Sequence, residues 1–567
     1  MAFQLSPGVN VSEYDLTTIV PAVGTTEGAI AGQFSWGPSN TIVTISNEVE
    51  LADRFGPPDA NNFATWLTAA NFLSYARNLK VVRAANSSSD KNATDGTGIY
   101  IPNQDVYTYS YSDMSAVDAA GTFAARYIGD KGNGLKVSLF ANGSNSNAWT
   151  SWTSPSVEYY AEFDSKPSTS NYTGLRGGSN DEMHIIIIDE KGKFTGSPNT
   201  VLEKFSFVSK ASDARNDDGS SNYYVNVIND RSKYVYVINH ANSSNWGTTA
   251  ANTTFNSGIS QYYTVSLANG SSSTLSDAQL IASYDKFKNP EEVDVSLIMT
   301  GAASQTVSEH IVDNITEYRK DCVAFISPPA ANAINNFGDE VTDITAFRDQ
   351  FTSSSYAVMD SGWKYQFDKY NNVYRWVPLN GDIAGLCVRT DFERDPWYSP
   401  AGFNRGQIKN VIKLSWNPNK TERDELYKKG VNPIVTFPGE GTVLYGDKTM
   451  LARPSAFDRI NVRRLFIVLE KAIARAAKYS LFEFNDEFTR AQFVSLVEPY
   501  LRDVQGRRGI YQYRVVCDQT NNTPEVIDRN EFVGDIYIKP ARSINFIQLN
   551  FIAVRTGVAF DEIVGKF

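Results

Sequence analysis

Residues 441–448 (GTVLYGDK) are the part of the chain closest to a phosphate-binding loop of the type GxxxxGK[ST]. In that pattern lysine directly follows the second glycine, but here Asp447 stands after Gly446. A carboxylate at this place repels phosphate, and the apolar run 443–445 favours a strand that ends at a glycine turn. We therefore predict a structural turn and no nucleotide cofactor. Residues 129–134 (GDKGNG) also predict a tight turn, because they lack the strand and helix of a dinucleotide site.

Acidic side chains are grouped at Asp391, Glu393 and Asp395, where two carboxylates could act as general acid and base. Arg389 and Arg394 lie among them. Alternating charges of both signs favour an ion-pair cluster at a surface or an interface over a catalytic pair. We therefore predict no catalytic residue in this segment, and we do not expect the chain to be an enzyme.

Histidine and cysteine offer little material for metal or nucleophilic chemistry. The chain has three of each, widely spaced: His184, His240, His310, Cys322, Cys387 and Cys517. No CxxC pair occurs, and each cysteine lies in an apolar run, which favours buried free thiols over a metal site or disulfides. The first two histidines stand at the ends of expected strands and His310 in an expected helix. Free thiols imply a reducing compartment, so a reduced, cytoplasmic site of assembly is expected.

Length and composition limit the classes of protein that remain. A chain of 567 residues exceeds one hydrophobic core and predicts roughly three or four structural units. The net charge of −11 argues against general binding of nucleic acid through a basic surface. The first residues lack a signal peptide's basic and apolar regions, and the sequence holds no apolar run long enough to cross a bilayer. We expect a globular protein without membrane insertion.

The first third of the chain predicts an arm, part of a core and the start of an insertion. Residues 1–20 alternate apolar and polar side chains around 9–12 without a nearby hairpin partner, so an extended arm is expected. Residues 28–38 predict a strand, and Ser46 or Asn47 can cap a helix that Gly56 stops. A second helix from Phe63 to Leu73 and a strand over 79–84 follow. Residues 96–284 are rich in Asn, Ser, Gly, Thr and Tyr, which indicates a β-rich, surface-exposed insertion with strands over 184–189, 222–228 and 232–238.

The rest of the chain returns to mixed α/β patterns. Strands are expected over 293–299 and 322–329, with a helix near 306–320 between them. A long helix over 461–481 has an apolar face and, on another face, a basic stripe of Arg464, Lys471, Arg475 and Lys478. A second helix over 487–504 is expected to kink near Pro499, and strands follow over 509–517, 533–540 and 543–554. Residues 556–567 form a second arm with apolar anchors Val558, Phe560 and Ile563.

At this point the chain resembles the tail sheath proteins of contractile-tailed bacteriophages. The resemblance rests on several segments that occur together in one order: PGVNVSEYD (7–15), GAIAGQFSWGPSN (28–40), VELADRFGPP (49–58), NLKVVRAAN (78–86), ARYIGDKGNGLKVSLF (125–140), GDIAGLCVRTDFERDPWYSPAG (381–402), NPIVTFPGEGTVLYGDKTM (432–450), INVRRLFIVLEKAI (460–473) and FIAVRTGVAFDEI (551–563). Residues 145–284 match no pattern that we can place, which is expected of exposed, variable sheath domains.

The resemblance implies a structural subunit of a tail sheath. Its subunits would form sixfold rings stacked around an inner tail tube, with baseplate and tail terminator proteins as further partners and the virion as location. Contraction would drive the tube through the host envelope for genome ejection. The arms would add strands to neighbouring copies, through Pro7, Gly8, Val9, Val11 and Glu13 at one end and Val558, Phe560 and Ile563 at the other. The stripe of Arg464, Lys471, Arg475 and Lys478 is the predicted tube contact, and a solvated helix face is its alternative.

The predicted architecture is a mixed α/β multidomain fold. Residues 21–95 and 285–385 form a discontinuous α/β core, 96–284 the insertion, and 386–555 a C-terminal α+β domain that faces the tube, with arms at 1–20 and 556–567. Two alternatives stay open. The chain could be a β-rich receptor- or glycan-binding virion protein in which 96–284 is the working part, or the sheath of a phage-like injection device such as a tailocin or a type VI secretion system.

Overall fold

The computed structural model describes residues 24–545 and residue 548, apart from the segments 115–117, 143–147, 155–156, 242–244 and 257–261. Both predicted arms and most of the strand expected over 543–554 lie outside these residues. The same holds for all the arm positions predicted for strand exchange: Pro7, Gly8, Val9, Val11, Glu13, Val558, Phe560 and Ile563.

The chain divides into two compact units, which are described separately. The large unit contains the described residues of Ala22–Pro396 and Pro400–Ala472. The small unit contains Trp397–Ser399 and the described residues from 473 onward. The predicted domain boundary at 385/386 falls inside helix α11 (Asn380–Glu393), whereas the division between the units falls inside α13 (Ile460–Ala477).

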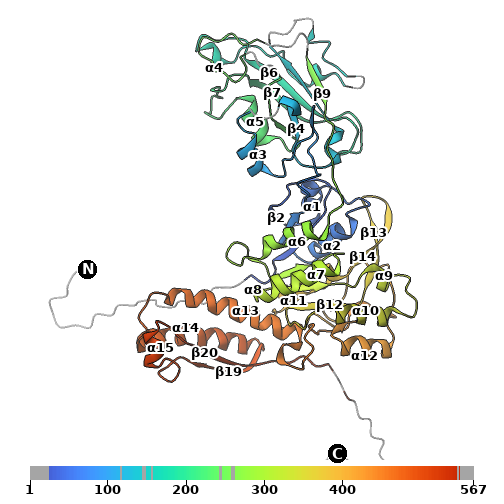
Figure 1. Ribbon diagram of the computed structural model, residues 1–567, viewed down its shortest axis with the longest axis vertical. Coiled ribbons are helices and arrows are strands. Elements are labelled where there is room, and N and C mark those ends of the chain that lie inside the picture. The colour runs from blue at the N-terminus through green and yellow to red at the C-terminus, as the bar shows by residue number, and fades with distance from the viewer. Residues whose placement is uncertain are drawn as a thin grey trace, which may run out of the picture. The chain divides into compact units, whose positions relative to one another are not determined.

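The large unit is built on a seven-stranded sheet of order β16-β12-β11-β10-β1-β3-β2. Figure 1 labels two of its strands, β2 and β12. Six strands run parallel, and β2 pairs antiparallel with β3. The sheet takes strands from both sides of residues 96–284: β1 (Gly28–Gly32), β2 (Ile42–Ile45), β3 (Leu79–Arg83), β10 (Leu297–Met299), β11 (Val323–Ile326), β12 (Ala357–Asp360) and β16 (Val431–Asn432). This is a mixed α/β fold, as predicted, with a core that the insertion interrupts.

Local sequence signals explain the first helices. Asn47 accepts a hydrogen bond from the amide of Glu50 and so caps α1 (Glu48–Phe55), as predicted. Gly56 ends this helix with φ of +75°, a conformation that favours glycine. Helix α2 (Phe63–Leu73) follows, and all its residues from Trp66 onward are buried.

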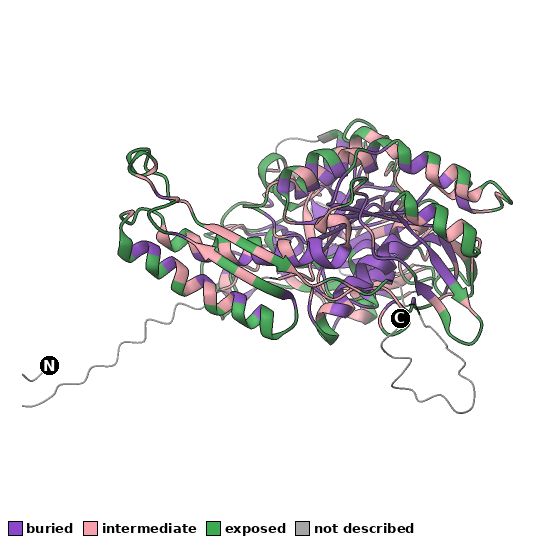
Figure 2. Cartoon of the chain, turned by 90° about the horizontal axis from the view of Figure 1, so that it is seen from below, coloured by how far each residue is buried: buried purple, intermediate pink, exposed green. Residues whose placement is uncertain are grey.

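Hydrophobic layers cover both faces of the sheet, because neighbouring strand residues point to opposite sides. Ile30 and Val358 face α1, α2 and α11 on one side. Ala29 and Met359 face the other side, which is covered by α6 (Asp277–Tyr284), α10 (Glu340–Asp349) and the helix that begins at α7 (Gln305–His310), continues through the π-helical turn Ile311–Thr316 and ends in α8 (Glu317–Arg319). Figure 2 shows buried residues concentrated in this part of the chain.

The insertion has its own β-structure. A four-stranded antiparallel sheet of order β7-β6-β5-β9 forms its centre, and β4 pairs with β8. The elements are α3 (Gln104–Ser110), β4 (Phe123–Ala125), β5 (Leu135–Ala141), α4 (Asn171–Gly174), β6 (Glu182–Asp189), β7 (Thr200–Ser209), α5 (Tyr224–Arg231), β8 (Val235–Val237) and β9 (Tyr263–Ser266). The prediction of a strand over 222–228 is wrong, because most of this segment forms α5.

Two smaller sheets complete the large unit. One has the order β14-β13-β15, and the other is the hairpin β17-β18. Their bounds, with those of the remaining helices, are β13 (Trp363–Asp368), β14 (Val373–Pro378), β15 (Lys413–Leu414), β17 (Ile434–Phe437), β18 (Gly441–Leu444), α9 (Ala330–Ala333) and α12 (Lys420–Lys428).

The small unit pairs one long helix with two strands. Helix α14 (Glu487–Gly506) packs against β19 (Ile510–Val516), which pairs antiparallel with β20 (Asp535–Pro540); α15 (Pro524–Asp528) lies between the strands in sequence. Pro499 lies within α14, which continues as one helix through it. Ile510 is the only fully buried residue of the two strands, which Figure 2 draws mainly in pink and green.

Candidate assembly surfaces

The four basic residues predicted to form one stripe on a helix over 461–481 have different environments, and Lys478 stands just after the end of α13. Arg464 is buried, and its guanidinium lies 2.5 Å from the carboxylate of Asp391 on α11. The hydroxyl of Thr25 donates to the same carboxylate at 2.6 Å, and Arg464 also donates to the carbonyl of Cys387. These contacts join the start of the described chain, α11 and α13. Arg464 is therefore engaged inside the large unit.

Lys471 is engaged in a second internal cluster. Its ammonium lies 2.9 Å from the carboxylate of Asp294 and 3.6 Å from that of Asp321. Asp294 precedes strand β10 in the sequence. Arg319 completes this cluster with a hydrogen bond of 2.8 Å to Asp321. Only about a tenth of the Lys471 side chain is exposed. The stripe is thus discontinuous: the two residues nearer the helix start form ion pairs, whereas Arg475 and Lys478 are exposed in the small unit. The tube contact itself stays a prediction.

A sequence signal for the burial of Arg464 exists in its neighbours. Residues 462–469 (VRRLFIVL) place two arginines inside an apolar run. Arg463 is also buried, and it donates to the hydroxyl of Tyr356 at 3.0 Å. Charged residues within a run of this kind require buried partners, because an isolated charge is costly away from water. The identity of those partners, however, is not visible in the local sequence.

The predicted ion-pair cluster around residues 389–395 forms only in part. Arg389 pairs with Glu393 one turn further along α11 at 2.7 Å, and both side chains are partly exposed. Asp391 instead points to Arg464 and is buried. The segment therefore contributes a surface ion pair through Arg389 and an internal ion pair through Asp391.

The sheet β19-β20 is the clearest candidate surface for strand addition. It has two strands, so each has one edge without a neighbouring strand among the described residues. One face is covered by α14 through residues such as Phe493 and Val497, while Tyr511 and Tyr537 are exposed. Backbone N–H and C=O groups along an open edge are a template for pairing with another chain.

A buried polar cluster links β13, α11 and Tyr75, which follows the end of α2. Lys364 lies 2.9 Å from Asp382, and both side chains are fully buried. The hydroxyl of Tyr75 donates to Asp382 at 3.2 Å and accepts from the amide of Lys409 at 2.7 Å. Lys364, Tyr75 and Oδ1 of Asp382 are partnered within the chain, whereas the buried Oδ2 of Asp382 has no hydrogen-bond partner among the described residues.

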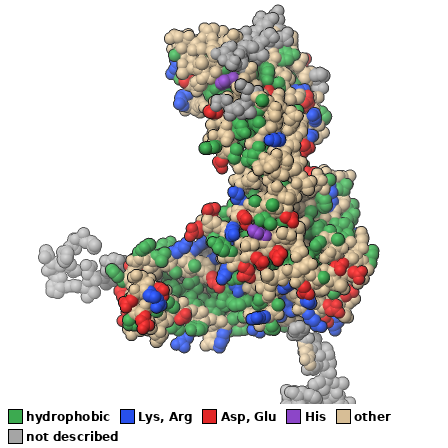
Figure 3. Space-filling view, viewed as in Figure 1, with side chains coloured by type: hydrophobic (Ala, Val, Ile, Leu, Met, Phe, Trp, Pro, Cys, Tyr) green, Lys and Arg blue, Asp and Glu red, His purple; other side chains and the backbone are tan. Residues whose placement is uncertain are grey.

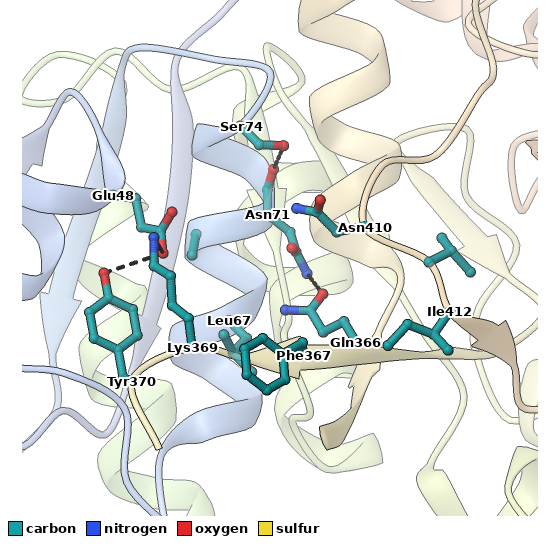
Figure 4. Close-up of a pocket in the computed structure, with 12 residues that line it drawn as sticks. Glu48, Leu67, Asn71, Ser74, Gln366, Phe367, Lys369, Tyr370, Asn410 and Ile412 are labelled. Carbon is teal, nitrogen blue, oxygen red and sulfur yellow. Dashed lines mark hydrogen bonds and ion pairs between the residues drawn. The ribbon is translucent and has the colours of Figure 1, made fainter. Parts of the chain in front are cut away.

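A cavity near these residues is lined by further polar groups, several of which pair with one another. It has a volume of 480 Å³ and lies between α2, the β13–β14 hairpin and residues 410–412 (Figure 4). Asn71 donates to Gln366 at 2.9 Å, and Glu48 pairs with Lys369 at 3.0 Å. Figure 4 shows these polar groups pointing toward one another. Its lining residues include no histidine or cysteine.

The histidines and cysteines have structural environments. His184 lies within β6, not at its end, and its buried ring stacks on Phe163, which lowers the pKa of His184 to about 4 through desolvation. His240 contacts the hydroxyl of Tyr224, and His310 pairs with Asp285. All three cysteines are buried free thiols, as predicted. Within the described ranges, no cluster of these ligand types could hold a metal ion, and no helix is long and apolar enough to span a membrane.

Residues 441–444 form the predicted strand, but no turn is assigned to residues 445–448, which follow it. Strand β18 ends at Leu444, and Asp447 accepts hydrogen bonds from Tyr427 and Arg459. Lys448 donates to the carbonyl of Tyr427 at 2.7 Å, so both charged residues of this segment have internal partners.

Comparison with known proteins finds phage tail sheath proteins along nearly the whole chain. Residues 28–84 match the family model described as the N-terminal region of domain III of tail sheath protein Gp18. Residues 274–450 match the central domain of phage tail sheath proteins, and 452–553 match their C-terminal domain. The tail sheath protein of Enterobacteria phage T4 is 34% identical over 99% of both chains, and that of Vibrio phage KVP40 is 32% identical over 99% of this chain and 100% of the relative.

Solved structures with a similar fold carry the same description. The sheath tail protein Lin1278 from Listeria innocua has a TM-score of 0.51 at 12% identity, covering 91% of this chain and 96% of its own. The helical sheath of the anti-feeding prophage in its contracted state has a TM-score of 0.50 at 12% identity, covering 97% and 99%. At this identity the likeness concerns the fold alone.

Proposed function

Because this chain belongs to the phage tail sheath protein family, we propose that it polymerises as stacked sixfold rings around an inner tail tube and contracts to drive that tube through the host envelope for genome ejection. The observation that carries the proposal is the similarity of 34% over 99% of both chains to a tail sheath protein. It extends over the core, the insertion and both ends. The alternative of a receptor- or glycan-binding protein, which needs only residues 96–284, has no comparable support.

Assembly through exchanged strands fits the open edges of β19-β20. We propose that residues 1–20 and 556–567 of neighbouring copies add strands to this sheet. Each added backbone hydrogen bond contributes only about 0.5–1.5 kcal/mol, but several bonds per arm repeat at every subunit of the polymer. A connection made through the backbone can also persist while rigid domains rotate, because the arm and the domain are joined by the chain itself.

Contraction requires two packings of the same subunits. The extended array would be metastable, and the contracted array would bury more complementary surface. The energy is then stored during assembly and released when the baseplate lets the first ring move, without a nucleotide. The proposed partners are further copies of this chain, the inner tube protein, the baseplate and the tail terminator. The proposed place of assembly is the host cytoplasm, and the finished protein is part of the virion.

Removal of the arms tests the proposal. Purified full-length protein is expected to polymerise into wide hollow tubes visible by electron microscopy, whereas an adhesin forms discrete oligomers. Variants that lack residues 1–20 or 556–567 are expected to keep the far-ultraviolet circular dichroism and thermal transition of the intact subunit but to stop forming tubes. Truncated protein that builds tails and contracts like the intact particle overturns the role of the arms. Full-length protein that forms only discrete oligomers overturns the proposed function.

A further inference from the structure

The turn between α13 and α14 exposes an unusual number of large apolar side chains. Residues 479–488 (YSLFEFNDEF), here called the aromatic tip, contain five of them, all largely exposed: Tyr479, Leu481, Phe482, Phe484 and Phe488. Exposed hydrophobic side chains are visible at the left end of this helical hairpin in Figure 3. Scattered apolar residues are normal on a protein surface, but a continuous cluster marks a contact with another molecule.

Backbone geometry adds a second observation at the same place. Phe482 has φ of +69° and its side chain is fully exposed. A bulky side chain in the left-handed region is strained, and nothing in its own side-chain packing offsets that strain. Such residues persist where a function requires them, so this geometry supports a binding role for the tip.

The charge of the tip restricts its partner. Glu483, Asp486 and Glu487 are acidic, and no lysine or arginine lies within residues 479–488. Asp486 caps α14 by accepting from the amide of Thr489, and hydrogen bonds from this residue lower its pKa. The tip is therefore aromatic and negatively charged. A complementary surface must offer apolar walls beside a positive charge.

A groove in the large unit has these properties. It has a volume of 590 Å³ and lies between the segment 408–417, which contains edge strand β15, and the β17–β18 hairpin. This edge groove is lined by apolar Ile408, Val411, Ile412, Leu414 and Trp416, together with uncharged polar residues. Lys413 is the one charged residue among the lining residues, and Lys409 is the other lysine of the segment. Ile412 is more than half exposed although it is a large aliphatic residue.

We propose that the aromatic tip of one subunit inserts into the edge groove of a neighbouring copy. The apolar side chains of the tip match the apolar lining, and Glu483 matches Lys413 in charge. Tip and groove are different surfaces, so the contact is heterologous, and repeated heterologous contacts generate rings or helical arrays. The inference rests on the proposed function, because it needs a polymer of this chain. It adds a side-chain contact to the proposed exchange of backbone strands.

Cross-linking decides which molecule receives the tip. Phe484→Cys combined with Ile412→Cys places one thiol on each surface, and the three natural cysteines are buried. Under mild oxidation the polymer is expected to give a ladder of covalent multimers on a non-reducing gel, and either single variant is not. A disulfide between the two introduced cysteines of the same monomer, or polymers that give no ladder of covalent multimers, overturns the contact between copies. In either case the proposed function stands. If full-length protein forms no polymer, both fall.

Charge and size variants give a second readout in case the cysteines perturb assembly. Phe484→Ala is expected to raise the critical concentration for polymerisation by about tenfold, as for a buried interface aromatic. Phe337→Ala, at the same exposure of 85% in another loop, is the matched control and is expected to leave it unchanged. Glu483→Lys is expected to weaken polymerisation and Lys413→Glu to restore it in the double variant. If Phe484→Ala polymerises at the critical concentration of the wild type, the proposal is overturned. The same holds if its polymers form normally and fail only to load on tubes.

Discussion

The guanidinium of Arg464 on α13 lies 2.5 Å from the carboxylate of Asp391 on α11, and about a twentieth of either side chain is exposed. Removing one partner of a buried pair leaves the other as an uncompensated charge, at a cost of about 3–5 kcal/mol. We predict that Arg464→Ala lowers the free energy of unfolding by this amount in urea titrations. Arg389→Ala, which breaks the partly exposed pair with Glu393 on the same helix, is expected to cost about 0.5 kcal/mol. Equal effects of the two changes would contradict this assignment.

Asp360 at the end of β12 should make stability depend on pH. Burial raises its pKa to about 8 from 3.8, although Ser327 and the amide of Gly362 donate to the carboxyl. The pKa is raised in the folded state, so the stabilisation is present at low pH and is lost as the pH rises toward 8. We predict that the free energy of unfolding of Asp360→Asn, relative to that of the wild type, increases by up to about 1.4 kcal/mol per pH unit between these two pKa values. Above the upper pKa value it increases no further.

Urea titrations from about pH 5 to about pH 9 measure this difference. Asp217→Asn, which changes an exposed carboxylate, is the comparison and is expected to follow the wild type. If the curves of Asp360→Asn and the wild type run parallel through the whole range, Asp360 is ionised in the folded protein.

Arg83 joins the core sheet to the insertion. Its buried guanidinium donates to the carbonyls of Phe34, Gly37 and Ile128 at 2.7–2.9 Å. Arg83→Met leaves three buried acceptors without this donor, and each unsatisfied acceptor costs about 1–3 kcal/mol. We predict a loss of at least about 3 kcal/mol and faster proteolysis between residues 84 and 130. Arg83→Lys should recover part of the loss, whereas Arg77→Met, at an exposed site, should have little effect. Unchanged proteolysis would show that other contacts hold the insertion.

The tube contact can be tested at the two exposed residues of the predicted stripe. Reversal of Arg475 and Lys478 to Glu is expected to weaken binding to purified tail tubes, by about 0.2–1 kcal/mol per exposed contact in each subunit. The loss should be larger at low salt, because salt screens exposed charges. Co-sedimentation with tubes measures it, and formation of tubeless sheath should be unaffected. The control is the double variant Lys191→Glu with Arg215→Glu, which makes the same change of charge at exposed positions of the insertion. Normal loading of the Arg475 and Lys478 variant on tubes would assign these residues to a solvated helix face.

Much of the local structure could be predicted from the sequence. The cap at Asn47, the stop at Gly56 and the apolar spacing of 63–73 each depend on residues within about one helical turn, so they are readable without a partner. The segment 222–228 shows the limit of this reasoning. Its apolar residues alternate as in a strand, yet they form α5, because Tyr224, Val225, Val227 and Ile228 can also all be buried on a helix.

The sequence alone determined the family, through the order of its motifs, and the positions of most helices and strands. Tertiary structure decided what the charged residues do. The spacing of Arg464 and Lys471 indicates a helix face, but their partners Asp391 and Asp294 lie 73 and 177 residues away in the chain. Only folding brings these groups together, since the energy of burying a charge depends on which opposite charge reaches it. Sheet edges such as those of β19-β20, which have no neighbouring strand in the described part of the chain, arise in the same way, because pairing is a property of the assembled sheet.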